Sequence, residues 1–156
     1  MKRTYTLFAA VLTLAASASA TAVAGAQGGT PAAHASKTTE VVLHHTSLGT
    51  ILTTSSGFTL YEFTRDRVGE DSCVKIHGCA QVWPALETSG KPTAGAGVKA
   101  SSLSSIRISG GARQVTYDGR ALYTYSADSR GSTAYVGVSA FGGSWYAVNA
   151  AGHWVK

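Results

Sequence analysis

The stretch GFTLYEFTRD at residues 57–66 returns as GRALYTYSAD at residues 119–128. The two stretches lie 62 residues apart, and the same offset aligns segment 48–90 with segment 110–152 at 11 identical positions of 43. The chain therefore contains an internal duplication. A copy of this length is near the lower limit for burying a core of its own. We expect the two copies to share one core about a pseudo-two-fold axis.

Turn signals inside each copy predict strands rather than helices. Asp118-Gly119 separates two runs rich in strand-forming residues, which is a strong hairpin signal, and Ser56-Gly57 stands at the matching place in the first copy. We predict an all-β fold, either an antiparallel sandwich or a barrel of about eight or nine strands, with one short helical turn near CAQVWP. Further strands are expected at residues 40–46 and 102–108, and a closing hairpin around 150–152.

The N-terminus has the features of a secretory signal peptide. Lys2 and Arg3 precede an apolar run, which is followed by small residues with possible cleavage after Ala20 or Ala26. We therefore expect the mature protein outside the cytoplasm, secreted to the cell envelope or beyond. The expected organisation is a signal peptide at 1–26, a disordered lead-in at 27–38 and a single β domain at 39–156.

Charge gives little indication of a partner. The basic residues are scattered along the sequence, so we expect no nucleic acid partner. An anionic wall polymer is one candidate partner, and an ordinary solvated surface is the alternative. The first apolar run is too short for a membrane span, and no cysteine stands near the cleavage sites, so we expect no lipid anchor.

Cys73 and Cys79 are the only cysteines of the chain. An even number in an exported chain predicts a disulfide. Together with His77 they form an alternative, a metal site that lacks one ligand for closed tetrahedral geometry. A redox-active dithiol is a further alternative, although its usual spacing is C-x-x-C. We predict the disulfide, with no metal ion and no cofactor.

The duplicated phrase places aromatic residues on one strand face and an aspartate after each strand. The rings form either a core face or a platform that stacks on a sugar or another planar ligand. Asp66 and Asp128 either fix turns or form the acid and base of a glycan hydrolase. The platform would consist of Tyr61, Phe63, Trp83, Tyr123, Tyr125 and Trp145.

These phrases resemble a bacterial family of secreted repeats, described as predicted lipoproteins with a Yx(F/W/Y)xxD motif. The motif stands here as YEFTRD, with Tyr61, Phe63 and Asp66, and as YTYSAD at residues 123–128, with Asp128 at its end. The resemblance extends from about residue 47 to 152. It implies a secreted protein, and the family has no established activity.

The first functional hypothesis is a non-enzymatic β domain with a binding or structural role at the cell envelope. It is based on the duplication, the scattered charge and the absence of catalytic motifs from the sequence. Two alternatives stay open: an envelope redox or metal-handling accessory protein that uses Cys73, His77 and Cys79, and a wall-glycan hydrolase that uses Asp66 and Asp128.

Overall fold

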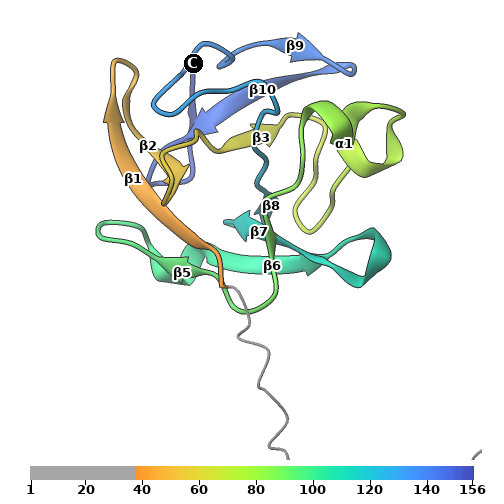
Figure 1. Ribbon diagram of the computed structural model, residues 1–156, viewed down its shortest axis with the longest axis horizontal. Helices are drawn as coiled ribbons and strands as arrows, with labels where there is room; N and C mark the ends of the chain where they lie inside the picture. Colours follow the sequence, from red (N-terminus) through yellow and green to blue (C-terminus); the bar gives the residue numbers. More distant parts are fainter. Residues whose placement is uncertain (1–37) are drawn as a thin grey trace, which may run out of the picture. The chain divides into compact units, whose positions relative to one another are not determined.

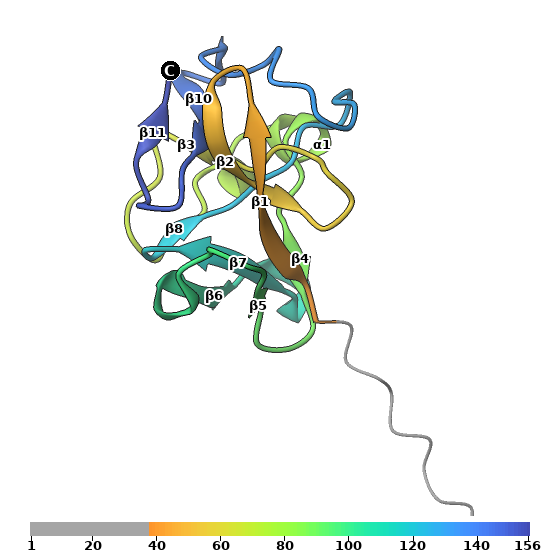
Figure 2. The same cartoon turned by 90° about the vertical axis from the view of Figure 1, so that its left-hand side faces the viewer.

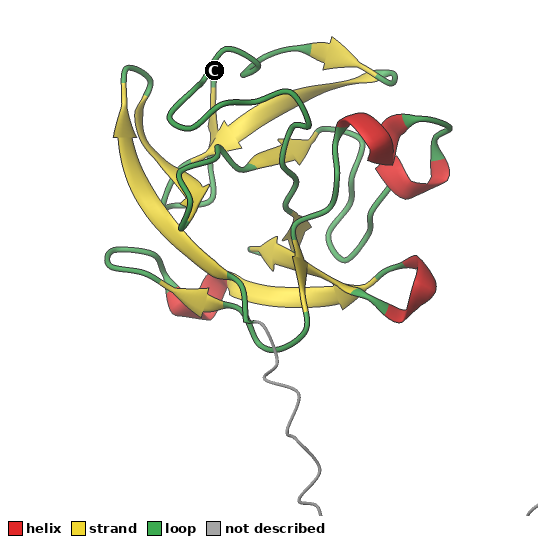
Figure 3. Cartoon of the chain, in the orientation of Figure 1, coloured by secondary structure: helices red, strands yellow, loops and turns green. Residues whose placement is uncertain are grey.

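The computed structural model describes residues 38–156. The predicted signal peptide and residues 27–37 of the predicted lead-in lie outside the described residues. Strands make up most of the regular structure, and the short helical turns lie in the connections between them (Figure 3). These turns are η1 (Cys73–Lys75), α1 (Cys79–Val82), η2 (Ala100–Ser102) and η3 (Ser109–Gly111). In this part of the chain no helix is long and apolar enough to cross a membrane.

The first sheet has the strand order β2-β1-β5. Its main unit is an antiparallel hairpin of β1 (Glu40–Thr46) and β2 (Gly49–Thr54). The short strand β5 (Thr93–Ala94) runs parallel to the start of β1. Strand β1 is the long curved strand drawn in orange in Figure 1.

The second sheet joins the two repeats. Strand β10 (Gly143–Val148) lies between β3 (Tyr61–Phe63) from the first repeat and β11 (Trp154–Val155) at the C-terminus. All these pairings are antiparallel, and β9 (Ser139–Ala140) also pairs with β10.

The third sheet also contains strands of both repeats. Strand β7 (Arg113–Tyr117) pairs antiparallel with β6 (Leu103–Arg107), with β8 (Arg120–Ala121) and with β4 (Glu87–Thr88). Figure 2 shows β6, β7 and β8 below the group formed by β3, β10 and β11.

The all-β fold with two repeats is confirmed, as is a short helical turn at the start of CAQVWP. The described residues contain no closed barrel. They form eleven strands rather than eight or nine, because five strands have only two residues and leave no pattern in the sequence. The expected strands at 40–46 and 102–108 correspond to β1 and β6, and β10 and β11 form the expected closing hairpin.

The Asp-Gly turn forms as predicted. Tyr117 and Arg120 face each other across β7 and β8, so only Asp118 and Gly119 lie in the loop. Both have positive φ, 46° and 79°, as a two-residue hairpin turn of type I′ requires. In the first repeat the backbone N–H of Gly57 bonds to the carbonyl of Thr54 at 2.8 Å and closes the corresponding turn.

The interior consists of two clusters, and each takes equivalent positions from both repeats. The aliphatic cluster includes the offset pairs Val41 and Leu103, Leu60 and Leu122, and Leu86 and Val148. The aromatic cluster includes the pairs Tyr61 and Tyr123, Trp83 and Trp145, and Phe63 and Tyr125. Burial of apolar surface is the main stabilising term in folding. The two repeats obtain this stabilisation jointly, because each contributes buried residues to both clusters.

Candidate functional site

The motif residues of the two repeats bind each other in a crossed arrangement, which we call the repeat seam. The hydroxyl of Tyr61 donates to Asp128 Oδ2 at 2.9 Å, and the hydroxyl of Tyr123 donates to Asp66 Oδ2 at 2.7 Å. Each tyrosine thus bonds to the aspartate of the opposite motif. Burial and the neighbouring carboxylates raise the pKa of both phenols, so the phenols act as donors at physiological pH.

The backbone at the seam repeats the exchange. The N–H of Tyr61 bonds to the carbonyl of Tyr123, and the reverse bond has the same length of 2.9 Å. The flanking turns exchange bonds of 2.8 Å in the same crossed manner, from Gly69 N–H to Gly119 O and from Gly131 N–H to Gly57 O. These crossed bonds of equal length follow the pseudo-two-fold relation between the repeats.

Two stacked tryptophans occupy the centre of the seam. The rings of Trp83 and Trp145 lie 4.0 Å apart with an interplanar angle of 3°. Phe63 stacks on Trp145 at 4.2 Å, and its equivalent Tyr125 packs on Trp83 at 4.6 Å. Neither indole N–H has a hydrogen-bond partner among the described residues.

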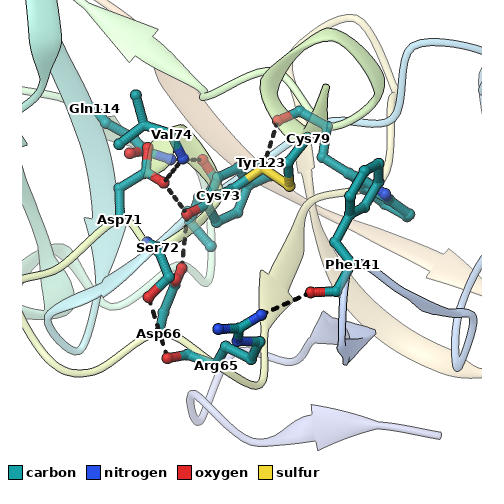
Figure 4. Close-up of a disulfide and its surroundings, with 12 residues drawn as sticks. Arg65, Asp66, Asp71, Ser72, Cys73, Val74, Cys79, Gln114, Tyr123 and Phe141 are labelled. Carbon is teal, nitrogen blue, oxygen red and sulfur yellow. Dashed lines mark hydrogen bonds between the residues drawn. A yellow bond between two sulfur atoms is a disulfide. The ribbon is translucent and has the colours of Figure 1, made fainter. Parts of the chain in front are cut away.

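Asp66 follows strand β3 in the chain and is 4% exposed. Its Oδ1 accepts the backbone N–H of Ser72 at 2.7 Å, while Oδ2 accepts the hydroxyl of Tyr123. The same hydroxyl lies 2.8 Å from Oδ1 of Asp71 (Figure 4). A hydroxyl carries a single proton and can donate it to only one carboxylate at a time. Burial, with a smaller effect of the Asp71 charge, raises the pKa of Asp66, so a proton on Asp66 can satisfy the second contact.

Asp128 has a more open setting. It is half-buried, and its Oδ1 accepts the backbone N–H of Ser129 at 3.1 Å while Oδ2 accepts the hydroxyl of Tyr61. No second carboxylate contacts Tyr61 in the described part of the chain. The two motif aspartates therefore have equivalent tyrosine partners but differ in their backbone donors and in their burial.

Cys73 and Cys79 form a disulfide, and both are fully buried beside the seam (Figure 4). Tyr135 and Phe141 occupy the offset positions in the second repeat and are partly buried in the aromatic cluster. Tyr135 packs on Tyr125 at 4.0 Å. Ring packing in the second repeat thus takes the place of the covalent link in the first.

The possible metal ligands do not converge. The sulfurs of Cys73 and Cys79 are bonded to each other, and His77 is exposed. Within residues 38–156 no group of three or more His, Cys, Asp or Glu side chains is placed to hold a metal ion.

The six rings of the hypothetical ligand platform lie together at the seam. Tyr61, Phe63, Trp83, Tyr123 and Trp145 are at most 1% exposed, and only Tyr125 is partly exposed. A ligand would have to displace neighbouring side chains to stack on the buried rings. These rings pack on each other, as the rings of a core do.

One buried polar group was not anticipated from the sequence. Glu62 is 1% exposed, and its Oε2 accepts Arg120 Nε at 2.8 Å and Trp154 Nε1 at 2.6 Å. Burial raises the pKa of Glu62. The only available signal was its alternation with Tyr61 and Phe63, which places it on the opposite face of β3. That signal does not reveal that the C-terminal tryptophan covers it.

The sequence of both repeats matches a known protein family. The model of a family described as a secreted repeat of unknown function matches residues 43–87 and again residues 104–149. The two matches cover more than half of the 156-residue chain, and they overlap the two repeats read from the sequence at 48–90 and 110–152. No curated protein and no solved structure gives a significant match.

Proposed function

The chain belongs to this family of secreted repeats of unknown function, and we propose that it is a non-enzymatic binding domain of the cell envelope or the extracellular space. The predicted signal peptide agrees with secretion. We assign the binding role to the folded surface rather than to the motif residues.

The crossed pairing at the repeat seam is the observation that carries this proposal. Both phenols and both motif carboxylates are engaged in bonds between the repeats, so the motif has a structural use in each copy. A domain whose two halves are joined by buried hydrogen bonds and stacked rings is a rigid support for a binding surface.

The two alternatives receive less support. A glycan hydrolase needs two carboxyl groups that reach one substrate, whereas Asp66 is buried and Asp128 is bound in a different turn. A thiolate metal site needs free sulfurs, and here both are oxidised in a disulfide.

Sedimentation with insoluble envelope material tests the proposal. The purified secreted chain is mixed with sacculi that retain their attached polymers, and bound protein and released soluble sugar are measured over time. We expect saturable binding without sugar release, and loss of binding after the chain is reduced and denatured. Progressive sugar release, or failure to sediment with the sacculi, would contradict the proposal.

A further inference from the structure

A groove lies at the β4–β7–β6 sheet. Its cavity volume is about 640 Å³. Two arginines, Arg107 and Arg113, line it together with the hydroxyl residues Thr39 and Thr88 and one acidic residue, Glu87. The groove therefore carries more positive than negative charge.

The two arginines are direct cross-strand partners in the pairing of β6 with β7. Like charges in this position destabilise a sheet unless something compensates them. Arg113 is fixed by Ser105, because its Nε and Nη2 donate to the Ser105 hydroxyl and carbonyl, each at 2.9 Å. Arg107 is exposed and has no hydrogen bond or ion pair with any described residue. Neither arginine thus forms an ion pair with a described residue, although Glu87 lines the same groove.

A second depression shares Arg113 with the first. It has a volume of about 380 Å³ and is lined also by Lys91, Pro92 and Ser104. Arg107, Arg113 and Lys91 therefore line two depressions that both include Arg113, and we call this surface the cationic track. Three cations in these depressions suit a ligand with repeated negative charges better than a single ion.

The overall distribution of charge favours the same kind of ligand. Residues 38–156 contain ten Lys and Arg, which is the thirteen of the whole chain less Lys2, Arg3 and Lys37. They contain all eight acidic residues, but Glu62, Asp66 and Asp71 are buried. Arg120 is paired with the buried Glu62, so nine basic residues face the five acidic residues that remain. Such an imbalance attracts polyanions.

We propose that the cationic track binds a phosphate-bearing polymer of the cell envelope, a chain of polyol phosphate units. This inference rests on the proposed binding function and specifies its surface and its ligand. Arginine presents a planar fork of donors that matches the oxygens of a phosphate group. One phosphate held between Arg107 and Arg113 would neutralise the like-charge pair, and Lys91 would contact the next phosphate.

Titration calorimetry of the secreted chain with poly(glycerol phosphate) tests the track. Arg107→Gln should weaken binding about tenfold, because it removes one charge-assisted contact. The matched control is Arg67→Gln, since Arg67 is exposed, lies outside the groove and has no side-chain hydrogen bond or ion pair with described residues. Glu87→Gln should strengthen binding, because it removes the acidic residue of the groove, and added salt should weaken it.

Equal effects of Arg107→Gln and Arg67→Gln would overturn the track as the binding surface. Equally tight binding of polygalacturonate, a carboxylate polymer, would overturn the phosphate assignment, as would tighter binding of single-stranded DNA. Sacculi stripped of phosphate polymers separate this inference from the proposed function. Undiminished sedimentation with stripped sacculi would overturn only the inference, whereas no sedimentation with either preparation would overturn the proposed function as well.

Discussion

Both carboxylate oxygens of Asp66 accept hydrogen bonds, one from Ser72 N–H and one from the Tyr123 hydroxyl. An asparagine in its place retains one acceptor oxygen for the Ser72 N–H, and the Tyr123 hydroxyl can still donate to Asp71. Its amide group brings two buried hydrogens, however, and the Tyr123 oxygen can accept only one of them. We expect Asp66→Asn to lower the free energy of unfolding by about 1–3 kcal/mol.

Asp128→Asn is the matched control for that substitution, because Asp128 has the same two kinds of donor but is more exposed. Asp128→Asn should lower the free energy of unfolding by less than Asp66→Asn does. Thermal and urea denaturation of both variants measure the difference. If Asp66→Asn left the unfolding free energy unchanged, the structural role of Asp66 would be wrong.

The raised pKa of Asp66 also predicts a pH dependence. Its ordinary value is 3.8, so between this pH and the folded pKa the folded protein retains a proton that the unfolded chain has lost. The stability that this proton confers is fully present below about pH 4 and is lost as the pH rises through the folded pKa. Urea denaturation at a series of pH values should therefore show the advantage of wild type over Asp66→Asn shrinking from pH 4 upward.

Salt serves as the control for this measurement, because desolvation of a buried group is screened far less than attraction between exposed charges. The same shrinking difference should appear at high ionic strength. A difference that grows as the pH rises would show that Asp66 is stabilised as a carboxylate, contrary to the effect of its burial.

Among the elements, the segment from η1 to α1 is the one closed by a covalent link. The bridge spans six positions between Cys73 and Cys79. In the chain-entropy model so short a loop contributes about 2 kcal/mol. We expect Cys73→Ala with Cys79→Ala to lower the unfolding free energy by about this amount, or by more where the buried sulfurs leave a cavity. Intact mass before and after reduction provides the chemical check, since absence of a gain of two hydrogens would contradict the bridge.

The element scale also shows what local sequence signals can predict. The Asp118-Gly119 turn was predictable because both loop positions need positive φ, which these residue types tolerate. The divergence of the repeats at α1 was not predictable from the offset alone. In the second repeat Phe141 and Gly142 have φ of 57° and 79° and turn β9 into β10, whereas the equivalent Cys79 begins a helical turn tied to Cys73.

At the scale of the whole molecule, the shared interior predicts that neither repeat folds alone. A fragment of residues 38–98 would expose its half of the aliphatic and aromatic clusters, and so would a fragment of residues 99–156. We expect each fragment alone to give the poorly dispersed amide NMR spectrum of an unfolded chain. An equimolar mixture should recover the dispersed spectrum of the intact chain, and a well-dispersed spectrum from either fragment alone would contradict the shared core.

The candidate site shows where sequence reasoning reaches its limit. The 62-residue offset reveals that Tyr61 and Tyr123 are equivalent, but it does not reveal that each bonds to the other copy's aspartate. The scattered positions of Arg107, Arg113 and Lys91 gave no sign of a cluster, because their proximity depends on strand register and on the connection from β4 to β6. Long-range pairing of this kind follows from tertiary packing, which no local pattern encodes.

The crossed bonds at the seam also affect how such a chain can change through time. A mutation that removes Asp128 leaves the phenol of Tyr61, in the other motif, without its acceptor, so the damage appears in the copy that did not mutate. Neither motif can therefore change independently of the other, and the two motifs are constrained as a single unit.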